Sequence, residues 1–389
     1  SKLELLRKWD CNVPTLRFQE FTDPWTLMPL KKLLCFQNGI NADSAKYGKG
    51  VKFISVSDIL NNQYITYDCI KGMIDIDKKT MERFLVEYGD ILFQRSSETF
   101  EDIGRANVYL DKEHPATFGG FVIRGKKISE YNPMFFRYLL CTPNARKQTV
   151  RMGAGAQHYN IGQDGLGKIS LYFPTIQEQQ KIAGFLSAID DRISVQNKII
   201  SKYETLIKGL CDMIFSSIEG NILPLKAIAS IEKGQQINGM SLAKTGKYYY
   251  LNGGIAPSGY IDDYNTSEET ISISEGGNSC GFVSYNIQKF WSGGHCYTLK
   301  IITEQCRSKY LFFYLKYKEK DIMQLRVGSG LPNIQKKSLE NFNVKLPNYK
   351  KQCFVERILE VITAKKEIEN ALLERFQSQK KFLLSKMFI

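Results

Sequence analysis

The chain has 389 residues and a formal net charge of +13, with an isoelectric point near 9.1. This length exceeds one ordinary domain and predicts two or three, and a basic folded chain often binds a polyanion, most often nucleic acid. The nine cysteines form no C-x-x-C pair and no apolar run reaches about 18 residues, which argues against a zinc ribbon, a redox motif and a membrane span, so we expect a cytoplasmic protein without a secretion signal.

Residues 1–24 are predicted to form an N-terminal arm, and residues 25–173 a first mixed α+β domain. Short β-prone runs such as Ile91-Leu92-Phe93 and Phe121-Val122-Ile123 are punctuated by glycine and asparagine. One helix is predicted near Pro133–Cys141. Loops on such a rigid frame are where recognition residues usually lie.

A long helix is predicted over residues 174–216, because apolar residues follow a 4,3 spacing over nearly five heptads. Gln196 alone interrupts this seam. About 40 residues at a rise of 1.5 Å would form a rod of roughly 60 Å. The seam includes Ile182, Leu186, Ile189, Ile193, Ile200 and Tyr203.

The second half has the same organisation, with a mixed domain over residues 217–346 and a long helix over residues 347–389. Alongside the seam of this helix runs a second apolar stripe, which we expect the other long helix to cover. The alternative is that each helix packs only on its own domain. The seam includes Val355, Leu359, Ile362, Leu373 and Phe376, and the second stripe Phe354, Ile358, Val361, Ile368 and Leu372.

The two halves form an internal repeat. Met28-Pro29-Leu30-Lys31 recurs as Leu223-Pro224-Leu225-Lys226, and the glycine-rich run at 150–155 recurs at 325–330. Gln179, just inside the first long helix, matches Gln352 in the second. A common frame with divergent inserts favours two modules that do one job on different targets, although a duplication without functional meaning would leave the same pattern.

Motifs for catalysis are missing from the sequence. No G-x-x-x-x-G-K-[ST] phosphate loop exists, and no G-x-S-x-G lies between a strand and a helix. The three histidines, His114, His158 and His295, lack partners at metal or triad spacing. These absences favour a binding protein over an enzyme.

One family carries this order of motifs. Trp25-Thr26-Leu27-Met28-Pro29-Leu30 is followed by Gly89-Asp90-Ile91-Leu92-Phe93, and then Pro174-Thr175-Ile176-Gln177-Glu178-Gln179 opens a long helix. Over essentially its whole length the chain resembles the specificity subunit of type I restriction–modification systems. The second copy departs from the pattern, with Lys350-Lys351-Gln352 at its helix start, which predicts a recognition domain of a different subtype.

The resemblance implies two mixed α/β target recognition domains separated by two long antiparallel coiled-coil helices, related by a pseudo-twofold repeat. Each domain would read one half of a split duplex DNA site. The helices would fix the separation of the half-sites and dock two methyltransferase subunits, and ATP-dependent restriction subunits are further family partners. The chain itself would catalyse nothing and hold no cofactor or metal, since S-adenosylmethionine, ATP and Mg²⁺ would bind to the partner subunits.

Donor-rich loops are the predicted base-reading sites, because amide, hydroxyl and guanidinium groups distinguish base edges. A loop at residues 153–160 comes first, and a segment after a strand second. Each has an alternative, a tight turn for the loop and a surface arginine without a role for the segment. The first half supplies Gln157, His158, Tyr159 and Asn160, with Arg95, Ser96 and Ser97; the second supplies Ser274, Asn278, Ser279, Ser329 and Asn333.

Lysines near the start of each module are predicted phosphate contacts, with ordinary solvated charge as the alternative. They are Lys46, Lys49, Lys244 and Lys247. Two other function classes stay open at this stage. One is an RNA-binding protein, since tyrosines and basic β-rich modules also suit stacked single-stranded bases; the other is a coiled-coil adaptor without sequence-specific DNA binding.

Overall fold

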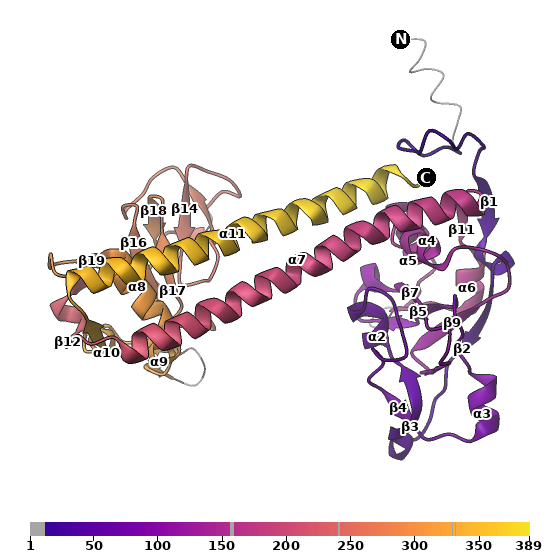
Figure 1. Cartoon of the computed structure of the whole chain (residues 1–389), viewed down its shortest axis with the longest axis horizontal. Coiled ribbons are helices and arrows are strands. Elements are labelled where there is room, and N and C mark those ends of the chain that lie inside the picture. Colours follow the sequence, from indigo (N-terminus) through magenta and orange to yellow (C-terminus); the bar gives the residue numbers. More distant parts are fainter. Residues whose placement is uncertain (1–11, 156–158, 240–241, 329, 331) are drawn as a thin grey trace, which may run out of the picture. The chain divides into compact units, whose positions relative to one another are not determined.

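The structure is a computed structural model that describes residues 12–155, 159–239, 242–328, 330 and 332–389. It consists of two compact units (Figure 1). Unit 1 comprises the described residues up to Asn197 together with Leu372–Ile389, and unit 2 comprises Lys198–Ala371. The predicted domain limits, which place each long helix apart from its domain, stay a prediction.

Unit 1 is built on a four-stranded antiparallel sheet in the order β2-β9-β5-β7 and a three-stranded sheet in the order β4-β3-β8. A separate antiparallel pair, β1 with β11, brings residues about 145 positions apart together. The strands are β1 (Thr26–Pro29), β2 (Leu34–Asn38), β3 (Tyr47–Ile54), β4 (Met73–Ile74), β5 (Ile91–Gln94), β6 (Ser96–Ser97), β7 (Ala106–Val108), β8 (Thr117–Phe118), β9 (Val122–Lys127), β10 (Tyr159–Asn160) and β11 (Ser170–Phe173).

The predicted helix near 133–141 is confirmed as α4, and its start follows from local chemistry. The side-chain oxygen of Asn132 accepts the Phe135 N–H at 2.9 Å, and Pro133 occupies the first turn, where its missing N–H costs nothing. Buried aromatic residues of α4 meet Trp25 and Phe93 in the main core. The helices of this unit are α2 (Val56–Asn61), α3 (Lys78–Arg83), α4 (Pro133–Leu140), α5 (Pro143–Arg151) and α6 (Gln163–Lys168).

Unit 2 repeats this plan. Its four-stranded sheet has the order β13-β19-β16-β17, its three-stranded sheet the order β15-β14-β18, and β12 pairs with β22 as β1 does with β11. The elements are β12 (Asn221–Pro224), β13 (Ala229–Lys233), β14 (Tyr248–Leu251), β15 (Gly259–Ile261), β16 (Thr270–Ser274), β17 (Val283–Asn286), β18 (Phe290–Ser292), β19 (Cys296–Ile301), β20 (Arg326–Val327), β21 (Asn333–Ile334), β22 (Asn343–Leu346), α8 (Ser308–Tyr317), α9 (Glu319–Met323) and α10 (Lys336–Glu340). The internal repeat predicted from the sequence is therefore confirmed in the strand order.

Two long helices, α7 (Ile176–Ser217) and α11 (Tyr349–Lys386), confirm the heptad prediction (Figure 1). Within unit 1 they run antiparallel, because the last turns of α11 lie against the first turns of α7. Lys380 forms an ion pair with the buried Asp190, and the Arg192 guanidinium lies over the Phe376 ring at 5.2 Å. Within unit 2 the first turns of α11 share a core with Phe215, near the end of α7.

The seam residues are buried or half-buried, but each helix also packs on its own domain. Ile182, Leu186 and Ile189 lie in the same core cluster as α4 and the end of α11, whereas Val355 and Leu359 join the core around α8. Ile200 is buried, and the half-buried seam residues are Ile193, Tyr203, Ile362, Leu373 and Phe376.

The prediction that the other helix covers the second stripe of α11 is wrong for three residues. Phe354, Val361 and Ile368 are 64%, 51% and 67% exposed. The buried face of α11 in unit 2 is the seam, where Val355 and Leu359 join the core around α8, and the three exposed residues lie outside that face. We call Phe354, Val361 and Ile368 the apolar stripe of α11.

Candidate nucleic-acid interface

In unit 1 the structure brings two predicted segments together at the end of the central strand β5. The Arg95 N–H donates to the Phe121 carbonyl at 2.8 Å, and the Ile161 N–H donates to the Arg95 carbonyl at 3.0 Å. Arg95 thus joins the start of β9 to the loop that ends at Ile161. Beside it, β6 pairs with β10, so that Ser96 faces Asn160 and Ser97 faces Tyr159.

The side chains of this cluster are positioned by one another. The Ser96 hydroxyl donates to Asn160 Oδ1 at 2.5 Å, and the Tyr159 ring packs on Phe100 with 5.2 Å between ring centroids. Arg95 is half-buried and donates from Nη1 to the Gly120 carbonyl at 3.2 Å. An arginine held at one guanidinium nitrogen keeps its other donors for a ligand.

The loop at residues 154–160 is closed at its base. Ala154 and Asn160 exchange both backbone hydrogen bonds, at 2.9 and 2.8 Å, and Gly155 has a positive φ of 136°, which favours glycine. Gln157 and His158, two of its predicted base readers, lie outside the described residues. The base of the loop is therefore closed as the tight-turn alternative predicted, and DNA contact by Gln157 and His158 stays a prediction.

Unit 2 places its predicted residues in the same frame. The Glu275 N–H donates to the His295 carbonyl at 2.9 Å, and the Ile334 N–H donates to the Glu275 carbonyl at 2.8 Å. Gly276 pairs with Asn333 as Ser96 does with Asn160. Asn278 and Asn333 are exposed here, and Ser329 lies outside the described residues.

Two serines predicted as DNA contacts in unit 2 donate to the same backbone carbonyl. Ser274 is 4% exposed, and its hydroxyl donates to the Gly253 carbonyl; Ser279 donates to the same oxygen at 2.7 Å. Ser274 therefore cannot touch DNA as it is placed, because it faces inward from β16. The sequence missed this because a serine on a buried strand looks the same as one at a strand end.

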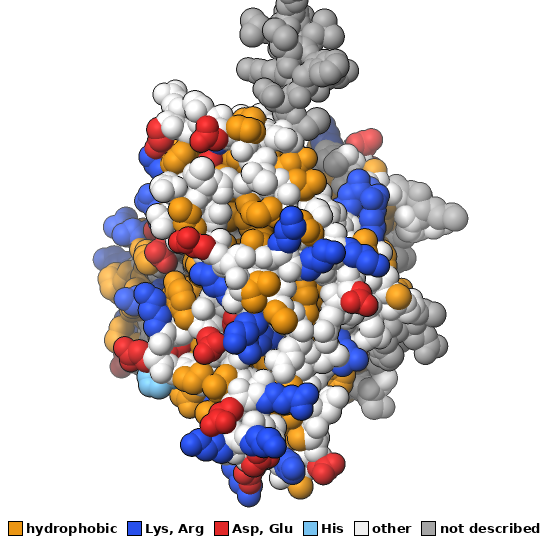
Figure 2. Space-filling view, turned by 90° about the vertical axis from the view of Figure 1, so that its right-hand side faces the viewer, with side chains coloured by type: hydrophobic (Ala, Val, Ile, Leu, Met, Phe, Trp, Pro, Cys, Tyr) orange, Lys and Arg blue, Asp and Glu red, His pale blue; other side chains and the backbone are white. Residues whose placement is uncertain are grey.

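The four predicted phosphate-contacting lysines are all exposed. Lys49 forms an ion pair with Asp75 at 3.1 Å, and the Lys247 ammonium lies 5.3 Å from the Tyr248 ring centroid. On the face drawn in Figure 2, lysine and arginine side chains are spread among apolar ones and do not form one dense patch. Charge alone therefore does not locate the interface.

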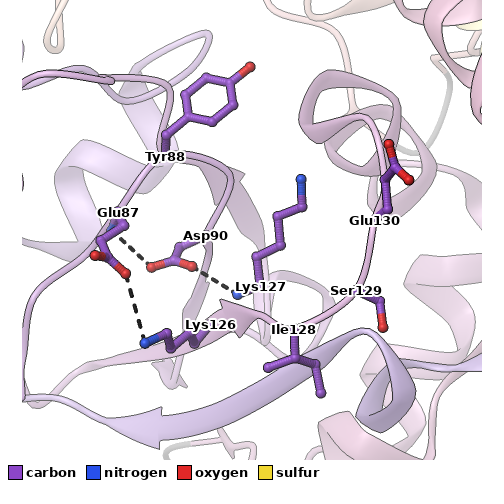
Figure 3. Close-up of a pocket in the computed structure, with 8 residues that line it drawn as sticks. All are labelled: Glu87, Tyr88, Asp90, Lys126, Lys127, Ile128, Ser129 and Glu130. Carbon is purple, nitrogen blue, oxygen red and sulfur yellow. Dashed lines mark hydrogen bonds and ion pairs between the residues drawn. The ribbon is translucent and has the colours of Figure 1, made fainter.

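A surface hollow of about 410 Å³ lies at the opposite end of the same sheet, lined by Glu87, Tyr88, Asp90 and residues 126–130 (Figure 3). Asp90 precedes β5, whereas Arg95 follows it. The Asp90 carboxylate accepts the backbone N–H groups of Glu87 and Lys127, both at 2.9 Å, and the Arg124 Nε–H at 2.7 Å. The aspartate of the Gly-Asp-Ile-Leu-Phe motif thus fastens the start of β5 to β9.

Two more exposed residues lie in these frames. Sequence reasoning did not single out Phe121 as a site residue, and it interpreted His295 only as a structural or DNA-contacting histidine without catalytic partners. Their backbone carbonyls accept the hydrogen bonds from Arg95 and Glu275 described above. The signal was present, because both follow a glycine pair, Gly119-Gly120 and Gly293-Gly294, at the same place in the repeat.

Two features are absent from the part of the chain that the structure describes. No helix in that part is both long and apolar enough to cross a membrane. No three or more of the histidine, cysteine, aspartate and glutamate side chains described there are grouped so as to hold a metal ion.

The chain has two copies of one α+β domain and two long helices, and each copy brings hydrogen-bond donors together at one end of its sheet. This arrangement defines a binding protein with an internal repeat. The chain belongs to the family described as type I restriction modification DNA specificity domain, whose sequence model matches residues 23–205 and 221–377. It is thus a specificity subunit of the type I restriction–modification class, as the sequence resemblance predicted.

Three relatives show how far the similarity extends. The MjaX specificity subunit of Methanocaldococcus jannaschii is 23% identical over 405 aligned positions, 94% of this chain and 93% of that protein. The MjaVIII specificity subunit of the same organism is 32% identical over 51% of this chain and 47% of its own length. A type I specificity subunit of Mycoplasma pneumoniae is 32% identical over 39% of this chain and 40% of its length, so these last two matches each span about half or less of the relative.

Solved structures share the fold. The type I restriction–modification S subunit from M. genitalium has a TM-score of 0.69 at 18% identity, covering 97% of this chain and 99% of that chain. A chain from a structure describing complex assembly and conformational transition of the type I system has a TM-score of 0.57 at 13% identity, covering 94% and 98%.

Proposed function

We propose that this specificity subunit reads one bipartite duplex DNA site, with unit 1 reading one half and unit 2 the other. The observation that carries the proposal is the repeated frame. Arg95 and Glu275 occupy equivalent positions, each joined by backbone hydrogen bonds to a turn on one side and a loop on the other. Two units that read different half-sites need the same backbone geometry with different side chains on it.

The chemistry of the exposed side chains supports base reading. Arg95 has free guanidinium donors suited to guanine O6 and N7, and Asn278 and Asn333 carry amide groups that match adenine. The backbones of Arg95 and Asn333 are fixed by hydrogen bonds and strand pairing, so little backbone conformational entropy is lost there on binding. The exposed lysines Lys46, Lys49, Lys244 and Lys247 would contribute phosphate contacts, which add affinity without sequence.

The apolar stripe of α11 supports docking of methyltransferase subunits. Phe354, Val361 and Ile368 recur every seven residues on one helix face and are more than half exposed. Helices recognise each other through such a spacing. In this proposal the partner subunits, in the cytoplasm, bind S-adenosylmethionine, and restriction subunits bind ATP and Mg²⁺; the chain described here directs them and catalyses nothing.

A randomised duplex pool tests this function. The full chain, co-expressed with its methyltransferase partner, is bound to the pool at low salt and the retained duplexes are sequenced. The proposal predicts two short defined sequences separated by a gap of fixed length. Retention without enrichment would favour an adaptor, and preference for single-stranded RNA over duplex DNA in a competition would favour the RNA-binding alternative.

A further inference from the structure

Each unit contains a tight turn that begins with two glycines, residues 119–122 in unit 1 and 293–296 in unit 2. We call these the Gly-Gly turns. The Val122 N–H donates to the Gly119 carbonyl at 2.8 Å, and the Cys296 N–H donates to the Gly293 carbonyl at 3.0 Å. The first glycine of each turn donates to the end of the three-stranded sheet, Gly119 to Ile54 and Gly293 to Leu251.

The second glycine of each turn lies against a side-chain amide. A Cβ atom on Gly120 would lie 1.6 Å from Asn41 Oδ1, and one on Gly294 would lie 2.9 Å from Gln236 Oε1. The turn therefore packs against a side-chain amide in both units, and the third residue is the first able to project a side chain. That third residue is Phe121 in unit 1 and His295 in unit 2.

The third residue projects into solvent beside the candidate interface. Phe121 is 69% exposed, although its neighbours Phe118 and Val122 are fully buried, and the His295 side chain is 65% exposed. Single exposed apolar residues are common on protein surfaces. Here, however, the position recurs in both units, and in each the carbonyl of this residue accepts the N–H of Arg95 or Glu275.

The two side chains have opposite binding chemistry. A phenyl ring has no hydrogen-bonding group, so the feature of a base edge that it can recognise in the major groove is the thymine methyl group. His295 Nδ1 lies 3.5 Å from Glu275 Oε2, while Glu275 Oε1 accepts from Lys233 Nζ at 2.6 Å and from the Tyr297 hydroxyl at 3.1 Å. A carboxylate that other groups hold beside Nδ1 favours the tautomer with its proton on Nδ1, so Nε2 remains to accept from a base amino group.

We infer that Phe121 and His295 are specificity-determining residues, the first contacting a thymine methyl group in one half-site and the second accepting from the amino group of adenine N6 or cytosine N4 in the other. The inference rests on the proposed function, since it assigns one base feature to each unit. A phosphate contact does not account for Phe121, because an uncharged apolar ring gains nothing from an anion.

Base analogues test the inference atom by atom. In the duplex selected from the random pool, each thymine is replaced singly by deoxyuridine, which lacks only the methyl group. Each adenine is likewise replaced by purine, and each cytosine by pyrimidin-2-one, which lack the amino group. The full chain with its methyltransferase partner is compared with Phe121→Ala and His295→Ala. Both positions are exposed, so both variants are expected to melt with the parent chain.

The expected result is a paired loss. One deoxyuridine in one half-site weakens binding by the parent chain about fourfold, the factor for burying one methyl group, and has no effect on Phe121→Ala. One base without its amino group in the other half-site weakens binding by the parent chain and leaves binding by His295→Ala unchanged. Each variant therefore serves as the control for the other half.

Three outcomes would overturn the inference. If the pool shows no split motif, the proposed function fails and the inference fails with it. If a split motif appears but Phe121→Ala remains as sensitive to every deoxyuridine as the parent, the inference alone is wrong. If His295→Ala weakens all duplexes equally, His295 contacts phosphate and is not a base reader.

Discussion

At the scale of single residues, Gly120 holds the Gly-Gly turn of unit 1 against Asn41. A methyl group on Gly120 would overlap Asn41 Oδ1, at 1.6 Å, and the exposed Asn41 side chain would have to rotate away. Gly120→Ala is therefore expected to destabilise unit 1 by about 1 kcal/mol, the low end of the range for overpacked sites. The matched control is Gly209→Ala on α7, where nothing lies within 4 Å of the added atom and helix propensity predicts a gain of about 1 kcal/mol. Urea unfolding measures both, and equal stability of the two variants would contradict the packing argument.

Cysteine reactivity reports on the second Gly-Gly turn. Burial raises the pKa of the Cys296 thiol, which closes that turn, to about 11, and because only the thiolate reacts, its reactive fraction at pH 8 is about one in a thousand. Cys35 and Cys141 are exposed. Alkylation at pH 8 followed by mass spectrometry should label Cys35 and Cys141 quickly and Cys296 only after unfolding. Labelling of Cys296 at the rate of Cys35 would mean that the turn opens in the native state.

At the scale of elements, one glutamine fastens the start of each long helix to its domain. Gln179 accepts the Asn132 N–H at 2.9 Å and donates to the Pro174 carbonyl at 3.0 Å. Gln352 accepts the Arg307 N–H at 2.9 Å and donates to the Pro347 carbonyl at 2.8 Å. This shared geometry is the physical reason for the glutamine that recurs at both helix starts.

Removing either glutamine should loosen its own unit. Gln179→Ala and Gln352→Ala each leave buried backbone groups without partners, which costs about 2–3 kcal/mol. Gln180→Ala, at the exposed neighbouring position, is expected to change stability by less than about 0.5 kcal/mol. Hydrogen exchange resolves the units, with faster exchange in α4 for the first variant and in α8 for the second. Exchange changing equally in both units would show that the effect is not local.

The sequence predicted the elements that carry long-range periodicity and missed the short ones. The heptads predicted the bounds of both long helices to within three residues, and the repeat predicted that the two units share one plan. Helices α2, α3 and α6 have six residues each, too few for an amphipathic pattern to appear. Helix α5 began after a Thr142 cap and Pro143, a start signal that was readable but unused.

The candidate site was predictable in position more than in detail. Loop residues such as Ser96 and Asn160 lie together because their segments flank repeated motifs. The Ser274 side chain points inward and the Phe121 side chain points outward. These orientations depend on strand register, because a shift of one residue moves every side chain to the opposite face of the sheet. Strand register depends on pairing with segments far away in the sequence, so the local sequence did not predict these orientations.

At the scale of the whole molecule, the account requires the apolar stripe of α11 to be covered by a partner. Ile368→Lys places a charge at a position that is 67% exposed, so chain stability should change by less than about 0.5 kcal/mol, whereas docking of an apolar partner helix should be lost. The measurement is co-purification of the methyltransferase subunit. Glu367→Lys, at an exposed position about 100° around the helix from Ile368, should retain the partner, and equal retention by both variants would remove the stripe from the interface.

The central claim is that each unit reads its own half of one split site. The most direct test repeats the random-pool selection with Arg95→Ala, altered in unit 1, and Asn278→Ala, altered at an exposed position in unit 2. The account predicts a split motif for the parent chain, relaxed at one position of one half by Arg95→Ala and of the other half by Asn278→Ala. If both variants relax the same half, or weaken all sequences uniformly, the division of reading between the two units is contradicted.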